Sequence, residues 1–494
     1  MVRRAFPFRA SEWVGVPVLA LILVIAWASH DYQRAPVLPT VFTPYLPVNL
    51  LEKPTSRKVF AHYMPSLPIS IDNKDGAEDY YATEYLKVNG EDGKHAAYGG
   101  FLRDRPLPRA HSDRADWKLA DLFTEISQAK SVNIDGFAVD VFTPRTESDA
   151  TDLILRAAAA VSDFTIMITA DVTGPFRGMS PADFAANVAP YLSAPAAFRL
   201  SDGRPVLGAF DADAKTPEWW RSVLALLRDK LTRDVAFVPT FLAVNDNPEK
   251  FADISYGFSI WGGRSPSAMA TADAGRGSAV DVIRRAHRLG KLWMQPVAFQ
   301  DSRPRDGIFQ ESDNGVTDRL AWQLAEQQQA QWVQLVTWND YAESTAMAPS
   351  VMHGWSILDM NAYDIVWFKS GRRPRVLRDA IFLSYRDQFV SARSVYHEIA
   401  PMHVLPGSGQ PRDTIEVVTF ATAPADVVIT AGTQHYACHV PAGRGVCTFP
   451  LTLGSISAQL RRDGEPVAVA RSGADVTDNP YVQDLQYRVT GGLR

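Results

Sequence analysis

The chain has 494 residues, of which 46% are hydrophobic and 21% are charged, and its formal net charge at neutral pH is −5. This composition is that of a globular protein, and the length suffices for one large domain and a smaller one. The mild excess of acidic residues argues against nucleic acid or an anionic membrane surface as a partner.

The N-terminal segment 1–29 has the pattern of an export signal. Arg3, Arg4 and Arg9 precede an uncharged apolar run from Val14 to about Ser29. Such a run after a basic stretch is typical of a signal peptide, and "AWA" at 26–28 offers a cleavage site. The run is also near the lower length limit for crossing a bilayer, so an uncleaved signal anchor is the alternative. Both readings predict an exported protein that is secreted, periplasmic or attached to the cell envelope.

Residues 30–56 are rich in proline and predict a linker. Beyond it, short apolar runs alternate with helical patterns, and we expect a long loop at 65–116. The predicted strands are 58–64, 135–142, 164–172, 204–210, 235–242, 256–262, 291–299 and 332–340. The predicted helices are 117–131, 149–161, 181–193, 217–230, 278–289 and 316–330, with a last one at 374–389. This order predicts a (β/α)8 TIM barrel over 57–400. An open dinucleotide-binding sheet is disfavoured, because no G-x-G-x-x-G opens the first helix.

The C-terminal segment 405–494 has short alternating runs broken by Gly, Pro and Asp, which predict a small all-β sandwich. Its two cysteines, Cys438 and Cys447, are separated by a stretch with Pro and Gly. We expect a disulfide that ties a hairpin in an oxidising compartment, with two reduced buried thiols as the alternative. A metal site is disfavoured, because no His or Cys partners stand nearby at ligand spacing.

Polar and aromatic side chains gather where the predicted strands end, which is where TIM barrels build their active sites. They are His62, Asp140, Asp171, Asp211, Trp261, Gln295, Asp340 and Glu343. Several acids around one rim, with aromatic residues among them, suit glycoside cleavage, in which one carboxyl protonates the leaving oxygen and another activates water or attacks carbon. Taken singly, each residue has a structural alternative as a helix cap, a buried ion pair or a core side chain.

The stretch "VTWNDYAEST" at 336–345 places two acids, Asp340 and Glu343, three positions apart. Acids at this spacing also occur at helix N-termini, where they interact favourably with the helix dipole. That alternative does not explain Trp338 and Asn339 beside them, or Pro349 soon after. The sequence therefore favours a catalytic pair.

Four stretches resemble glycoside hydrolase family 71, the α-1,3-glucanases or mutanases: "VFAHYM", "AKSVNIDGFAVDVF", "FTIMITADV" and "VQLVTWNDYAES". The last is the most specific, because residues 337–344 match the family pattern T-W-N-D-Y-G-E-S at every position but one. "TIEVVTFATAPADVVITAG" in the C-terminal module also looks like the family. The resemblance implies an endo-acting hydrolase of α-1,3-linked glucan that inverts configuration and needs no metal or other cofactor.

Carried over by resemblance, Glu343 is the general acid and Asp340 is the base that activates water. The candidate substrate-binding residues are His62, Asp140, Asp171, Asp211, Trp261, Gln295, Trp338, Asn339 and Tyr341. An apolar rim that includes Trp338 and Tyr341 would raise the pKa of Glu343 by desolvation.

The sequence departs from the family pattern around the sugar-binding positions rather than at the two acids. Ala342 replaces a Gly, and would strain the loop if its φ were positive. Thr345 and Ala346 stand where the family commonly has His and Tyr, and Asp140 stands where an Asn is expected. Two alternatives therefore stay open: hydrolysis of another α-linked exopolysaccharide of the cell envelope, and a non-catalytic role in glycan binding or assembly. No oligomeric state follows from the sequence.

Overall fold

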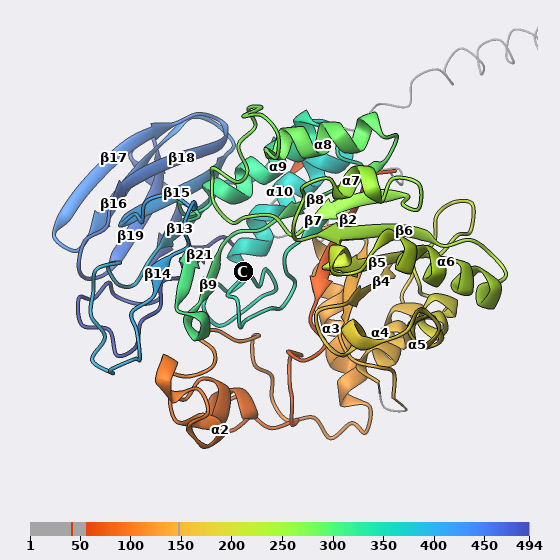
Figure 1. Cartoon of the computed structure of the whole chain (residues 1–494). Coiled ribbons are helices and arrows are strands. Elements are labelled where there is room, and N and C mark those ends of the chain that lie inside the picture. Colours follow the sequence, from red (N-terminus) through yellow and green to blue (C-terminus); the bar gives the residue numbers. More distant parts are fainter. Residues whose placement is uncertain (1–40, 43–55, 147–148, 494) are drawn as a thin grey trace, which may run out of the picture. The chain divides into compact units, whose positions relative to one another are not determined.

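Eight parallel strands close into a barrel, and a helix follows each strand on the outside (Figure 1). The computed structural model describes residues 41–42, 56–146 and 149–493. Around the barrel the strands run in the order β11, β2, β3, β4, β5, β6, β7, β8. Their bounds are β2 (Lys58–Tyr63), β3 (Gly136–Val141), β4 (Thr165–Asp171), β5 (Val206–Phe210), β6 (Ala236–Phe241), β7 (Gly257–Ile260), β8 (Leu292–Val297) and β11 (Trp332–Leu335). Every strand predicted for the barrel contains one of them, so the TIM-barrel prediction is confirmed.

Four of the helices around the barrel, α4, α5, α6 and α8, begin at residues whose side chains satisfy a free N–H group of the first helical turn. Asp149, Ser180, Thr216 and Ser278 each accept a hydrogen bond from a backbone N–H two or three residues further on. The bounds are α3 (Trp117–Ser131), α4 (Ala150–Ala159), α5 (Pro181–Ser193), α6 (Pro217–Leu231), α7 (Asn247–Lys250), α8 (Ala279–Arg288), α9 (Val316–Gln327) and α10 (Ser356–Ser370). The short α7 fills the place between β6 and β7.

Alternation along the strands separates an apolar plug inside the barrel from the polar residues above it. Phe60, Ala138 and Met167 belong to one buried cluster with residues of β6, β8 and β11. Side chains two positions apart on a strand share a face, so His62 follows Phe60 and Asp140 follows Ala138 on the inner face. The carboxyl ends of these strands therefore present polar groups above a closed apolar floor.

Two antiparallel sheets form the predicted sandwich, but one of their strands, at 380–385, lies before the predicted start of this module at 405. One sheet has the order β18, β15, β13, β21 and the other has the order β17, β16, β19, β20; β15 to β20 are blue in Figure 1. The bounds are β13 (Ala380–Tyr385), β15 (Thr414–Ala421), β16 (Ala425–Ala431), β17 (Gln434–Val440), β18 (Gly443–Pro450), β19 (Ile456–Arg462), β20 (Glu465–Arg471) and β21 (Arg488–Gly491). Barrel and sandwich belong to one compact unit of the chain.

The helix predicted at 374–389 is wrong, because this stretch contains the strand β13, which pairs with β15 and β21. The helix that follows β11 is α10, which lies earlier in the chain. The error has a physical reason. Ile381 and Leu383 face the core of the sandwich, whereas Phe382 packs into the core shared with the barrel helices. Because both faces are buried, the strand lacks the polar alternation that distinguishes a strand from a helix.

A small three-stranded sheet joins the barrel to the sandwich. The hairpin of β9 (Asp301–Arg303) and β10 (Ile308–Gln310) follows β8, and β10 pairs in parallel with β14 (His403–Val404). Next to it, Gln300 exchanges two hydrogen bonds with the backbone of Tyr487. The sandwich therefore contacts the segment that leaves the upper end of β8.

The predicted disulfide between Cys438 and Cys447 is present, with the two Cα atoms 6.5 Å apart. Its strands are not partners in one hairpin, because β17 pairs with β16 and β18 pairs with β15. The bond therefore links the two sheets of the sandwich. The sequence spacing alone could not distinguish these arrangements, because two consecutive strands can pair with each other or cross between sheets.

The predicted signal segment 1–29 lies outside the described residues, as does most of the predicted linker. Within that linker, β1 (Val41–Phe42) pairs in parallel with β12 (Arg375–Val376). In the part of the chain that the structure describes, no helix is both long enough and apolar enough to cross a membrane.

Candidate active site

The loop after β11 holds Asp340 in a fixed position by hydrogen bonds to its own backbone. The Asp340 carboxylate accepts the backbone N–H of Ala342 at 2.9 Å and that of Glu343 at 3.1 Å through the same oxygen, Oδ1. The backbone N–H of Asp340 donates to the Thr337 hydroxyl at 2.7 Å. Burial raises the pKa of Asp340, and these N–H donors together with Arg303 oppose that rise. The Asp340 carboxylate thus caps the N–H groups of its own loop, as an acid at a helix N-terminus would, and also lies at the barrel rim.

Ala342 causes no strain in this loop. The left-handed backbone conformation falls on Ser344, with φ of 54°. The Ser344 hydroxyl donates to the carbonyl oxygen of Ser302 at 2.8 Å, which helps to fix the turn. The Gly-to-Ala departure therefore leaves the spacing of the two acids intact.

Glu343 lies beside Asp340 in a setting that favours its protonated form. Burial, aided by the Asp340 carboxylate, raises the pKa of Glu343 to about 8, against the opposing charge of Arg303. Its Oε1 lies 2.8 Å from Nη1 of Arg303. Its other oxygen, Oε2, is buried and has no hydrogen-bond partner among the described residues. A proton on Oε2 would remove the need to bury a bare charge there.

Next to β11 in the barrel, His62 and Asp140 face each other at the ends of β2 and β3. Burial lowers the pKa of His62 to about 3, so the ring is neutral. The Gln334 amide donates to Nδ1 at 3.3 Å, which places the ring proton on Nε2, 3.7 Å from Oδ1 of Asp140. Burial, together with the carboxylates of Asp171 and Asp340, raises the pKa of Asp140 well above its ordinary value.

A pocket of about 460 Å³ opens next to these residues and is lined by Asp140 and Asp171, among others. Asp171 accepts the backbone N–H and the hydroxyl of Thr173, both at 2.6 Å. Trp261 is half-buried and stands edge-on to the His62 ring, with centroids 4.9 Å apart. Asp211 follows β5 with a positive φ of 53°, and burial, aided by the carboxylates of Asp213 and Asp171, raises its pKa. The structure thus brings His62, Asp140, Asp171, Asp211 and Trp261 to the end of the barrel that bears Asp340.

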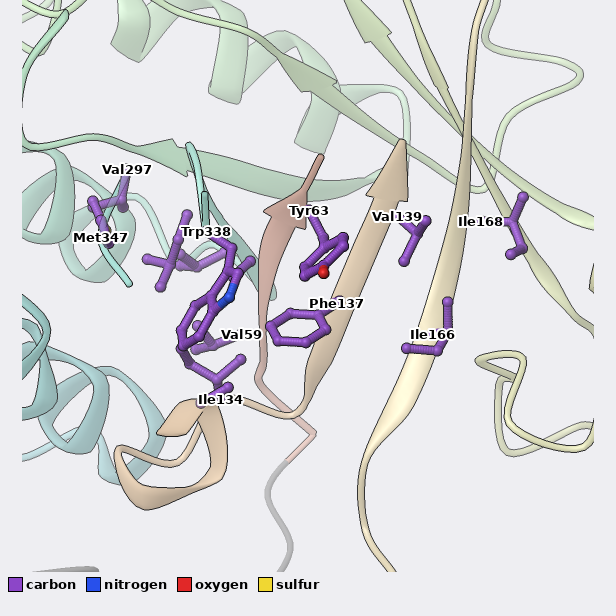
Figure 2. Packing of buried hydrophobic residues seen from close by; sticks show 14 of the residues in the cluster. Val59, Tyr63, Ile134, Phe137, Val139, Ile166, Ile168, Val297, Trp338 and Met347 are labelled. Carbon is purple, nitrogen blue, oxygen red and sulfur yellow. The ribbon is translucent and has the colours of Figure 1, made fainter. Parts of the chain in front are cut away.

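Three residues predicted to bind substrate instead support the loop from beneath. Trp338 is fully buried, packs against Phe137 with ring centroids 5.1 Å apart, and lies among Val59 and Ile134 in Figure 2. Its indole N–H donates to Glu125, whose pKa burial raises to about 8. These contacts leave no face of Trp338 for a sugar.

Asn339 and Tyr341 are likewise buried. The Asn339 side chain accepts the backbone N–H of Met64 at 2.7 Å and donates to the carbonyl oxygens of Met64 and Leu67. Tyr341 packs with Leu67 and Tyr81 in a cluster beneath the long loop after β2. Both residues join that loop to the loop that bears Asp340 and Glu343.

Gln295 does not line the site either. It lies on β8 on the same face as Trp293 and Val297, which pack against the outer helices. Its side chain accepts the Trp293 indole N–H at 2.8 Å and donates to the carbonyl oxygen of Pro296. The alternation along β8 points it away from the barrel interior, where Met294 lies.

We expect Gln295→Met to lower the free energy of unfolding by about 1–3 kcal/mol, because the buried Trp293 N–H loses its acceptor. The Michaelis constant should stay within about twofold of the wild-type value, because Gln295 faces away from the rim. Urea unfolding and steady-state kinetics measure the two quantities. A tenfold rise in KM at unchanged stability would contradict this expectation and indicate that Gln295 contacts the substrate.

Two further charged residues act on Glu343, one by direct contact and one through its charge. They are Asp301 and Arg303 on β9, which follow directly after the run that ends in "PVAFQ". These residues could have been predicted from the sequence, because the "DSR" stretch at 301–303 follows the end of a barrel strand, where polar site residues are expected. Gln295, by contrast, lies inside the strand. Among residues 56–146 and 149–493, no three His, Cys, Asp or Glu side chains are placed to share a metal ion.

Comparisons with known proteins identify the family. The model of glycosyl hydrolase family 71 matches residues 111–490. A mutanase of Penicillium rubens is 26% identical over 401 residues, which cover 74% of this chain and 83% of that protein. A glucan endo-1,3-alpha-glucosidase of Schizosaccharomyces pombe is 24% identical over 385 residues, which cover 72% and 86%. A solved GH99 endo-alpha-mannosidase from Bacteroides thetaiotaomicron superposes with a TM-score of 0.48 at 16% identity, over 64% of this chain and 99% of that one. Because the family match spans most of the chain, this protein is a glycoside hydrolase that belongs to glycosyl hydrolase family 71.

Proposed function

We propose that the protein is an endo-acting hydrolase of α-1,3-linked glucan that inverts the anomeric carbon, with Glu343 as general acid and Asp340 as general base. The observation that carries this proposal is the contrast between two neighbouring acids on one loop. Asp340 accepts two backbone N–H groups, which stabilise a carboxylate. Glu343 keeps one oxygen without a partner among the described residues, and burial raises its pKa to about 8.

The reaction follows from these two protonation states. Glu343 gives its proton to the glycosidic oxygen as the bond from that oxygen to the anomeric carbon breaks. Asp340 takes a proton from a water molecule, whose oxygen bonds to the anomeric carbon from the opposite face. The product is a new reducing end in the β configuration and a new hydroxyl on the leaving chain. At the end of the turnover Glu343 is ionised and Asp340 protonated, and exchange with solvent resets both groups.

The remaining residues of the rim bind the sugar in this proposal. Asp140 and Asp171 line the pocket of about 460 Å³ and offer oxygen atoms to sugar hydroxyls. His62 is neutral and carries its proton on Nε2, so it acts as a hydrogen-bond donor rather than as a charge. The half-buried ring of Trp261 provides an apolar face for the CH groups of a sugar.

The linkage and the cellular location come from the relatives and the sequence. The two curated relatives bear the names mutanase and glucan endo-1,3-alpha-glucosidase, which support α-1,3-glucan as the polymer and internal cleavage as the mode. The basic and apolar N-terminal segment supports export, with the protein secreted or attached to the envelope through segment 1–29.

The test is incubation of the full chain with α-1,3-glucan and, separately, with α-1,4-, α-1,6- and β-1,3-glucans. We expect new reducing ends from the α-1,3 polymer alone, with oligosaccharides of several lengths early in the reaction. Release of a single small sugar from the start would contradict endo action. Activity on another α-linked polymer but not on α-1,3-glucan would overturn the substrate and keep the reaction class.

A further inference from the structure

Arg303 lies between two acids and uses a separate nitrogen for each contact. Its Nε and Nη2 bond to the two oxygens of Asp301 at 2.7 and 2.6 Å. Its Nη1 lies 2.8 Å from Oε1 of Glu343. The planar guanidinium can serve both acids at once because its donors point outward in a fixed fork.

We propose that Arg303, clamped by Asp301, is a positioning residue that holds the Glu343 carboxyl at the reacting site and tunes how tightly it keeps its proton. This inference rests on the proposed role of Glu343 as general acid. It adds a specific contact: Arg303 bonds to Oε1 of Glu343, whereas Oε2 has no hydrogen-bond partner among the described residues and can carry the proton.

The ion pair of Arg303 and Asp301 is held in place by contacts with β10 and with the loop that bears Glu343. Asp301 is 1% exposed and also receives the Gln310 amide at 3.3 Å from the other strand of the hairpin. The hairpin is in turn bonded to the catalytic loop, because the backbone N–H of Ser302 donates to the carbonyl oxygen of Glu343 at 2.9 Å. The Ser344 hydroxyl closes a second bond to Ser302 at 2.8 Å. Arg303 therefore cannot leave Glu343 without breaking buried contacts on β9.

The charged groups that face Glu343 come from three elements. Asp340 stands on its own loop, Asp301 and Arg303 on β9, and Arg264 on the loop after β7. The two acids favour the protonated form of Glu343, and the two arginines favour the ionised form. Removing Arg303 or removing the charge of Asp301 should therefore shift the titration of Glu343 in opposite directions.

The experiment compares Arg303→Met and Asp301→Asn by the pH dependence of kcat/KM on α-1,3-glucan. Because Glu343 works when protonated, its titration sets the alkaline limb. We expect that limb to move to higher pH in Arg303→Met and to lower pH in Asp301→Asn, each by about one pH unit. In both variants kcat should fall by about tenfold or more, with a smaller change in KM. Arg303→Lys keeps the charge but not the fork, so it should lose kcat while its alkaline limb stays near that of the wild type.

A second measurement needs no substrate. Glutamate labelled with 13C at the side-chain carboxyl gives a resonance for Glu343 that is identified by its absence in Glu343→Gln. Its titration midpoint should rise in Arg303→Met and fall in Asp301→Asn. Arg305→Met, on the same hairpin and with Asp306 as its ionic partner at 3.5 Å, is the matched control and should shift neither midpoint nor limb.

The two proposals fail in different ways. If the wild type cleaves no α-1,3-glucan but the two midpoints move apart, the proposed function is wrong and the role of Arg303 stands. If the wild type is active and the midpoints of Arg303→Met and Asp301→Asn stay within about 0.3 pH units of the wild type, Arg303 is an ordinary structural ion pair and the inference is overturned. If Arg303→Met does not fold, the opposite shift in Asp301→Asn and the unshifted Arg303→Lys decide the question.

Discussion

Glu343→Gln is expected to lower kcat on α-1,3-glucan by about 10²–10⁴-fold, because the leaving oxygen loses its proton donor. The replacement is nearly isosteric, and its amide oxygen can still accept from Nη1 of Arg303, so the loop should keep its shape. Initial rates of reducing-end release measure the loss. Asp306→Asn removes an acid from the same neighbourhood and, at 42% exposure with only Arg305 as ionic partner, should leave kcat unchanged.

Asp340→Asn should lower kcat on α-1,3-glucan as much as Glu343→Gln does, but for a different reason. A substrate with another leaving group distinguishes the roles of the two acids. The Asn oxygen can still accept the N–H groups of Ala342 and Glu343, but the side chain can no longer take a proton from water. Fluoride departs without protonation, so an α-1,3-glucooligosaccharyl fluoride should restore much of the activity of Glu343→Gln. It should restore none in Asp340→Asn. The reverse pattern would exchange the roles of the two acids.

The pH profile of the wild type follows with a definite sign. The pKa of Glu343 is raised to about 8, so its proton is present below that pH and is lost above it. In the proposed mechanism Glu343 acts as the general acid, so kcat/KM should fall tenfold per pH unit as the pH rises beyond about 8. The acid limb belongs to Asp340, which must be ionised to act as base. In Glu343→Gln the alkaline limb should disappear when the fluoride substrate is used.

The largest expected effect on stability comes from Arg386, which lies between the barrel and the sandwich. Arg386 and Glu311 are 1% and 0% exposed and form an ion pair at 3.0 Å. The Tyr487 hydroxyl donates to Glu311 at 2.7 Å, and Arg386 donates to the carbonyl oxygens of Leu485 and Arg412. Arg386→Met leaves a buried carboxylate without its cation. We expect the free energy of unfolding to fall by about 3–5 kcal/mol, measured by urea denaturation at pH 7.

A double variant tests whether the loss comes from the unpaired charge. Arg386→Met combined with Glu311→Gln removes both charges, so its stability should lie above that of Arg386→Met alone. The matched surface control is Arg114→Met, whose partner Asp116 is exposed, and it should leave the stability close to that of the wild type. A loss below 1 kcal/mol in Arg386→Met would show that the pair contributes little to holding barrel and sandwich together.

The barrel could be predicted from the sequence because its strands are buried on both faces and separated by helices with recognisable caps. Burial of both faces also explains why β13 was wrongly predicted as a helix, because Phe382 packs toward the barrel helices and Ile381 toward the core of the sandwich. A strand with two apolar faces has no polar alternation, and only the tertiary partners reveal which kind of element it forms. The disulfide was predictable as a pair of cysteines, but which sheets it joins depends on strand pairing.

At the candidate site, the position of a residue along its strand was a better guide to its place at the rim than its closeness in sequence to Asp340 and Glu343. His62, Asp140 and Asp171 follow from alternation on strands whose ends face the rim. Trp338 and Asn339 look functional in the sequence because they adjoin the acids, yet their contacts are with Glu125 and Met64 beneath the loop. Conversely, Arg303 contacts Glu343 from a hairpin that precedes α9 and β11 in the chain. No pattern of neighbouring residues in the sequence indicates that contact.

The stereochemistry of the first product tests the central claim most directly. Hydrolysis of α-1,3-glucan by the wild type, followed by 1H NMR within the first minutes, reports the anomeric signal of the new reducing end before mutarotation mixes the two forms. Glu343 as acid and Asp340 as base on water predict that the β-anomer appears first and the α-anomer grows in later. An α-anomer that appears first would contradict the account, because one of the two carboxylates would then have attacked the sugar itself.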